Sequence, residues 1–179
     1  MKITILISFF SVFGAVGFVD INKCFREVYR ILKPGGIFAF SWFSPIFNCF
    51  PRSGENQLEI IRSYFDKSPL IEKKLTKKGI LVTYVEFHYT YEDWFRALTE
   101  NGFIVDLILE PPVKENDDWE SKTWEMFPKY KVSKIPSTTI WRAFKSPIKI
   151  QNLRKLIFSK SDELLKMLTE KGGVSNEKN

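Results

Sequence analysis

Apolar residues recur at helical spacing from position 21 onward and then give way to an almost continuous apolar run. The periodic positions are Ile21, Phe25, Val28 and Leu32. Asp20 stands where a helix N-cap would, and residues 37–43 form a short run typical of a strand covered on both faces. Between them, Pro34 cannot continue a helix, and Gly35 and Gly36 accept the positive φ of a type II turn. The pattern predicts a helix, a turn and a buried strand, an order typical of a parallel α/β fold.

The first nineteen residues allow two interpretations. An apolar run over residues 3–9 predicts a second buried parallel strand that opens into a loop over residues 11–18. The same stretch, with Lys2 before it and small residues up to Gly17, also has the layout of a secretory signal peptide. A membrane-spanning helix fits less well, because glycines and an aspartate leave the apolar stretch shorter than about 20 residues. We take the strand as the main prediction and a signal peptide over residues 1–17 as an alternative.

The middle of the chain predicts a helix, a lysine-rich surface segment and a β segment. Residues 53–65 show a helical apolar face made by Leu58, Ile61 and Phe65. The lysine-rich residues 67–78 should lie at the surface. Residues 79–89 read as a β segment that lies over the ligand cleft or at the edge of the sheet.

The last third predicts one capped helix, two strands and a separate helical extension. Thr90 and Asp93 form a plausible capping box for the next helix. A strand follows, with alternating apolar positions at Val105, Leu107 and Leu109. The acidic residues 115–125, which include Trp119 and Trp124, should form a loop or short helix. From residue 149 a basic helix is expected, with an apolar stripe made by Leu153, Leu156, Ile157, Leu164 and Leu168.

Four of these segments, in this order, resemble the second half of class I S-adenosylmethionine (SAM) dependent methyltransferases. Residues 27–36 read Glu-Val-Tyr-Arg-Ile-Leu-Lys-Pro-Gly-Gly and run into an aromatic-rich strand, as between that family's strands four and five. Residues 11–20 resemble the loop after strand four, and residues 89–112 resemble the last helix, strand six and its Glu-Pro ending. Residues 136–145 resemble the antiparallel strand seven. The resemblance implies a partial Rossmann-like sheet in the order 4, 5, 7, 6, with the last strand antiparallel.

The chain also departs from the family pattern. The three βα units that carry the family's glycine-rich loop and ribose-binding acid have no counterpart, and Gly14-x-x-Gly17 lacks the Gly-x-Gly core. Ile7 stands where the family usually has an aspartate. We therefore expect residues 1–146 to be the C-terminal half of a methyltransferase domain, and residues 147–179 to be a helical extension and tail. Whether such a chain is an enzyme by itself is left open, and we expect it to be inactive alone.

The resemblance also implies site residues. The loop after strand four would line the methionine end of SAM through Phe10, Ser11, Val12, Phe13 and Gly14. The loop after strand five would contact a small-molecule methyl acceptor through Trp42, Phe43 and Phe47. His88, the only histidine, is a weak candidate for a general base and could also touch the acceptor. Burial in a strand with a hydrogen-bond partner is the simpler interpretation of His88, and core packing is the simpler interpretation of the aromatic residues.

Charge and cysteine content limit the kinds of binding partner and site that we expect. The formal net charge is +6 and the isoelectric point is near 9.2, but the basic residues are scattered, so we expect neither nucleic acid nor a membrane as partner. Cys24 and Cys49 are too few and too far apart for a disulfide framework, and no metal site is expected. This composition favours the cytoplasm. The apolar strand at residues 3–9 could pair with a separate N-terminal half or with a second copy, which would make the chain a non-catalytic partner instead.

Overall fold

The computed structural model describes residues 5–113 and 126–147, and beyond them the single positions 160, 163, 166 and 167. The chain divides into two compact units, Met1–Lys145 and Ser146–Asn179. The described positions beyond residue 147 are helical, and the apolar stripe predicted for this extension lies outside the described residues. Residues 115–125, with both of their tryptophans, also lie outside them. The assignment of residues 1–146 to one half of a methyltransferase domain stays a prediction.

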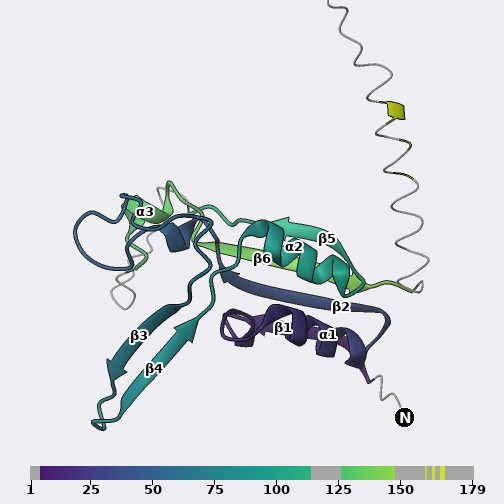
Figure 1. Ribbon diagram of the computed structural model, residues 1–179, viewed down its shortest axis with the longest axis horizontal. Helices are drawn as coiled ribbons and strands as arrows, with labels where there is room; N and C mark the ends of the chain where they lie inside the picture. Colours follow the sequence, from purple (N-terminus) through teal and green to yellow (C-terminus); the bar gives the residue numbers. More distant parts are fainter. Residues whose placement is uncertain (1–4, 114–125, 148–159, 161–162, 164–165, 168–179) are drawn as a thin grey trace, which may run out of the picture. The chain divides into compact units, whose positions relative to one another are not determined.

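The first unit is built on a four-stranded mixed sheet (Figure 1). Its strands lie in the order β1 (Leu6–Val12), β2 (Leu32–Phe43), β6 (Thr138–Lys145) and β5 (Phe103–Leu109). β1 and β2 are parallel, whereas β6 runs antiparallel to both β2 and β5. This is the predicted order of strands four, five, seven and six with the last strand antiparallel, so the predicted partial Rossmann-like sheet is confirmed.

Two helices, α1 (Ile21–Ile31) and α2 (Tyr91–Glu100), pack on one face of this sheet. Asp20 caps α1 by accepting hydrogen bonds from the backbone N–H groups of Asn22 and Lys23, as its position in the sequence predicts. The core between helices and sheet is mostly aromatic, with buried Phe25, Phe38, Phe40, Trp94 and Trp141 in mutual ring contact. Each such side chain stabilises the fold by about 1.5 to 3 kcal/mol through burial.

On the opposite face of the sheet, the side chains of β1 are exposed, whereas Ser41 of β2 is buried. Phe10 and Val12 of β1 pair with Ala39 and Ser41 of β2 and therefore point away from the helices. Their side chains are 65% and 77% exposed. Parallel sheets are normally covered on both faces, so this face and the neighbouring edge of β1 are unusual surfaces for a parallel strand pair.

Both parallel strands have different bounds from those predicted. β1 ends at Val12 and not at residue 9, because Phe10, Ser11 and Val12 continue the parallel ladder with β2. β2 begins at Leu32, before the predicted start at residue 37. The register jumps from Leu6↔Leu32 to Ser8↔Ile37, and Gly35 has φ 77°, so the predicted turn is present as an irregularity within the strand.

The helix predicted over residues 53–65 is wrong. Residues 51–69 form turns and bends, preceded by the short 3-10 helix η2 (Phe47–Cys49). Ile61 and Phe65 are exposed, so no core face rewards a helix here. The Arg62 side chain instead donates to the backbone carbonyls of Asp66 and Ser68, which stabilises a local turn.

A hairpin follows, made of β3 (Leu70–Leu75) and β4 (Leu81–Glu86). The strand predicted within residues 79–89 is therefore present as β4. β4 pairs with β3 and not with the main sheet, so the alternative that placed this segment at the sheet edge is wrong, and its place over the ligand cleft stays a prediction. The lysine-rich segment is exposed as predicted and supplies β3. Figure 1 shows the hairpin extending away from the four-stranded sheet.

Candidate functional site

The carboxyl ends of β1 and β2 converge on a tight loop. The chain leaves β1 at Phe13, which has φ 43° and donates its N–H to Ser41 O at 3.1 Å. The 3-10 helix η1 (Ala15–Gly17) follows, with Val16 and Gly17 buried. A Cβ atom built on Gly17 would lie 1.9 Å from the Trp42 ring, so only glycine fits beneath this indole. In open α/β sheets, ligands bind at this end of the strands.

An aromatic cluster fills this end of the sheet. We define it by Phe13, Phe18, Trp42, Phe43, Phe47 and Phe127, whose ring centroids lie between 5.1 and 6.1 Å from their neighbours. The predicted acceptor-binding residues Trp42, Phe43 and Phe47 are thus brought together, and all three are buried. Phe13 and Phe18 are 41% and 44% exposed, so they form the open side of the cluster.

Two buried polar atoms at this site have no hydrogen-bond partner among the described residues. They are Nε1 of Trp42 and Oγ of Ser41, which are adjacent in sequence and lie near the end of β2. An unsatisfied buried donor costs about 1 to 3 kcal/mol, so such groups call for an explanation. An indole N–H can only donate, and a ligand with an acceptor atom there would satisfy it.

Two cations lie against the aromatic cluster. Arg52 donates to both carboxylate oxygens of Glu86, at 2.8 and 2.5 Å, and its guanidinium lies 4.9 Å from the centre of the Phe43 ring. Lys131, on the short helix α3 (Lys129–Val132), is fully buried, with Nζ 3.9 Å from the Phe47 ring centre. Burial, reinforced by the positive charge of Arg52, lowers the pKa of Lys131 to about 8.

The sequence contains no signal for these contacts. Lys131 donates to Pro51 O at 2.6 Å, 80 residues away, and Arg52 meets Glu86 across 34 residues. Such pairs arise only from the folded path of the chain. The same holds for the Tyr91 hydroxyl, which contacts Glu110 and lies 3.1 Å from Ser44 Oγ. This contact ties the start of α2 to the end of β2.

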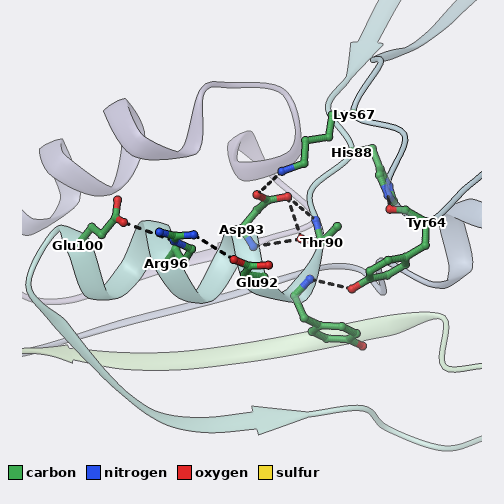
Figure 2. A network of polar contacts seen from close by, with 9 residues as sticks. Tyr64, Lys67, His88, Thr90, Glu92, Asp93, Arg96 and Glu100 are labelled. Atoms are coloured by element: carbon green, nitrogen blue, oxygen red, sulfur yellow. Dashed lines mark hydrogen bonds and ion pairs between the residues drawn. The ribbon is translucent and has the colours of Figure 1, made fainter. Parts of the chain in front are cut away.

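His88 lies in a different environment (Figure 2). Its Nε2 is 2.9 Å from the backbone oxygen of Tyr64, and since a carbonyl oxygen can only accept, Nε2 carries the proton. Burial lowers the pKa of His88, although its hydrogen bond to Tyr64 acts in the opposite direction. The residue is 1% exposed, and its ring makes a T-shaped contact with the Tyr64 ring. Burial and a hydrogen-bond partner match the simpler interpretation of His88, but the residue lies just after β4 and not within a strand.

The five residues predicted to contact the cofactor do not share one surface. Phe10 and Val12 point to the exposed face of the sheet, whereas Ser11 points to the helix-covered face because strand side chains alternate. Phe13 and Gly14 begin the loop beside the aromatic cluster. Of the five residues predicted to contact SAM, only Phe13 and Gly14 therefore lie in the loop at the carboxyl edge of the sheet. In the part of the chain that the structure describes, no group of three potential metal ligands occurs.

No helix among the described residues is long and apolar enough to span a bilayer. No protein-family model and no curated protein matches the chain. The fold does match solved structures. A proposed SAM-dependent methyltransferase from Listeria monocytogenes matches with a TM-score of 0.60 and 21% identity, over 81% of this chain and 63% of that one.

Two further solved structures agree with this match. A SAM-dependent methyltransferase from Mesorhizobium loti has a TM-score of 0.57 and 22% identity, with 79% of this chain and 62% of that one covered. One from Clostridium acetobutylicum has a TM-score of 0.50 and 14% identity, with coverage of 82% and 61%. The chain therefore has the fold of the SAM-dependent methyltransferases, and it spans less than two thirds of the length of these three proteins.

Proposed function

We propose that this chain forms the acceptor-binding side of a SAM-dependent methyltransferase that acts on a small molecule. The observation that carries the proposal is the sheet order β1-β2-β6-β5, with β6 antiparallel, in a fold that matches solved SAM-dependent methyltransferases. In this arrangement the carboxyl ends of β1 and β2 meet at the aromatic cluster, where such sheets bind their ligands.

The residues at this edge suit part of the cofactor. When bound, SAM supplies an activated methyl group on a positively charged sulfonium. The partly exposed rings of Phe13 and Phe18 offer π faces that attract a cation. The unpartnered N–H of Trp42 can orient an acceptor atom of a ligand. Transfer then depends on alignment and on exclusion of water, and no residue of this site needs to act as a base when the acceptor is already nucleophilic.

The residues at this edge do not suit the nucleoside end of SAM equally well. The sequence contains no Gly-x-Gly loop, and Phe10 and Val12 present only apolar side chains at the face where they lie. We propose that residues 1–179 alone bind SAM weakly, and that tight binding needs further polypeptide that carries the glycine-rich βα units. The edge of β1 suits such a partner, because it is apolar and, among the described residues, has no strand beyond it.

Isothermal titration calorimetry with SAM tests this proposal. The purified chain is titrated alone and after mixing with a polypeptide that carries three βα units and a Gly-x-Gly loop. We expect micromolar binding only in the mixture, because charge-assisted contacts to the nucleoside each contribute about 1.5 to 3 kcal/mol. The variant Ile7→Lys, placed on the exposed edge strand, should abolish binding in the mixture, and Ile60→Lys, an exposed residue outside the sheet, should not.

Micromolar SAM binding by the chain alone would contradict the proposal that tight binding needs the glycine-rich βα units. Absence of binding in both samples would contradict the methyltransferase role itself. In that case the second candidate is a non-catalytic half-domain that completes its sheet with a partner chain or a second copy, which the free edge of β1 favours. The secreted alternative predicts cleavage near Gly17, which would remove β1 from the sheet, and N-terminal sequencing of the mature protein tests it.

A further inference from the structure

One face of the hairpin of β3 and β4 exposes two apolar pairs, with Lys73 and Thr83 between them. Two cross-strand pairs, Ile71 with Val85 and Leu75 with Leu81, lie on the same side because each pair is separated from the next by an even number of residues. Ile71, Leu75 and Leu81 are 64%, 70% and 62% exposed. A two-stranded sheet is only marginally stable in water without a surface to pack on, so this face is suited to contact something else.

The end of the hairpin also concentrates positive charge. We call residues 73–83 the hairpin tip, and its lysines are Lys73, Lys74, Lys77 and Lys78. All four are exposed, and the tip contains no acidic residue. Glu72, just before it, pairs with Lys74 at 3.0 Å, so residues 72–83 carry four positive charges and one negative charge, a net +3.

The turn at the tip is ordered and holds these groups close together. Thr76 N–H donates to Ile80 O at 2.8 Å, and Thr76 Oγ1 accepts the N–H of Ile80 at 3.0 Å. Gly79 has φ 75°, a conformation that glycine adopts without strain. Exposed Ile80 therefore lies next to the pair of Leu75 and Leu81, in the same turn as Lys77 and Lys78. The scatter of basic residues along the sequence predicts no membrane contact, whereas the hairpin brings four lysines together with exposed apolar side chains.

We propose that the hairpin tip binds an anionic lipid surface, with Leu75, Ile80 and Leu81 entering the interface and the lysines contacting the headgroups. Each lysine near an anionic membrane contributes about 1 kcal/mol of attraction, and aliphatic side chains add binding by leaving water. A second copy of the hairpin is a poorer occupant, because two such hairpin ends, each of net +3 over residues 72–83, repel each other at close range. The inference is independent of the proposed methyltransferase role.

Vesicle co-sedimentation of the full chain tests the proposal. One set of vesicles contains phosphatidylcholine alone, and the other contains phosphatidylcholine with phosphatidylserine. We expect binding to the second set that weakens as salt is raised. The double variant Lys77→Gln with Lys78→Gln should lower the partition coefficient by about thirtyfold, since two lysines contribute about 1 kcal/mol each. Leu75→Ser with Leu81→Ser should lower it by roughly tenfold or more while all charges remain.

The matched control is Lys23→Gln with Lys33→Gln, which removes the same charge from exposed positions outside the hairpin. It should leave binding nearly unchanged, and circular dichroism should show all variants folded. Equal loss in this control, equal binding to neutral vesicles, or no binding would overturn the proposal. Competition by inorganic phosphate would point to a soluble phosphate site, and binding of an acidic polypeptide but not of vesicles would point to a protein partner. Either result would also overturn it.

Discussion

At the scale of single residues, the candidate site depends most directly on Gly17. Its backbone has no positive φ, so alanine would be tolerated by the backbone conformation. Space is the constraint, because a Cβ atom would lie 1.9 Å from the six-membered ring of Trp42. Gly17 O also accepts the N–H of Phe87 at 2.9 Å, which holds the loop in place. The indole and the loop therefore have little freedom to move apart.

We predict that Gly17→Ala lowers the free energy of unfolding by about 1 to 3 kcal/mol, as for other overpacked sites. Urea denaturation followed by tryptophan fluorescence measures this change. Gly14→Ala is the matched control, because its Cβ would meet only the movable Ser11 Oγ, and its cost should be smaller. With Trp42→Phe in the background, the cost of Gly17→Ala should fall by more than about 1 kcal/mol. Additive costs would show that the indole is not the obstacle.

Residue roles at this site were only partly accessible from the sequence. The predicted contact of Trp42, Phe43 and Phe47 with a common site follows from their position after a recognisable strand, and the structure brings them together. Lys131 could not be found in this way, because its partners are Pro51 and the Phe47 ring, far apart along the chain. Sequence spacing reports on local structure, whereas this contact depends on how distant loops pack.

At the scale of elements, helix α2 is the clearest case of local control. Thr90 accepts the N–H of Asp93, and Asp93 accepts the N–H of Thr90, so the predicted capping box is present (Figure 2). Burial raises the pKa of Asp93, but hydrogen bonds from Lys67 and Thr90 outweigh this effect and hold the pKa below its usual value. The cap therefore contributes its full stability above the pKa of the unfolded aspartate, near 4, and loses it as the pH falls.

We predict that Thr90→Ala lowers the free energy of unfolding at neutral pH by about 1 kcal/mol, because it removes the cap acceptor. Thr99→Ala in the same helix is the control. The Thr99 hydroxyl contacts only the backbone oxygens of Phe95 and Arg96 inside the helix, so its loss should be neutral or slightly stabilising. Thermal or urea denaturation measures both changes, and an equal loss in the two variants would contradict a specific capping role.

The same comparison explains why one predicted helix formed and another did not. Residues 53–65 have a helical apolar pattern like that of α2, but their apolar positions Ile61 and Phe65 face water. In α2 the corresponding positions Trp94 and Leu98 are buried against the sheet. A short amphipathic helix gains most of its stability from such packing. The apolar pattern therefore predicted α2 correctly, because its apolar face packs on the sheet. The same kind of pattern failed for residues 53–65, whose apolar positions Ile61 and Phe65 have no such surface to pack on.

At the scale of the whole first unit, the strand order was predictable because turn, helix and strand signals occur in a recognisable sequence. The pairing of β1 with β2 and of β6 with both its neighbours is as predicted. The hairpin was not foreseen as a separate element, because nothing local to β4 states whether it pairs with β3 or with the main sheet. The path of the chain decides which strands pair. Some strands therefore have a neighbouring strand on both sides and others on one side only.

This difference predicts an order of amide hydrogen exchange. β2 and β6 have strands on both sides and should exchange slowest, while β3 and β4 pair only with each other and should exchange fastest among the strands. The residues that flank β1 show which side is paired, because Ile5 N–H donates to Ile31 O, just before β2, and Phe13 N–H donates to Ser41 O of β2. Because N–H groups alternate in direction along a strand, Phe9 and Ser11 should also be protected, whereas those of Ser8, Phe10 and Val12 should exchange freely.

Exchange measured by nuclear magnetic resonance on the chain alone tests this alternation residue by residue. Equal protection of Phe10 and Phe9 would mean that the edge of β1 is covered in solution, either by residues of the same chain or by a second copy. Dilution separates these two cases, because protection by a second copy falls as the protein concentration is lowered and protection from within the chain does not. Free exchange at Phe10 would instead establish the open edge on which the proposed pairing with a SAM-binding partner rests.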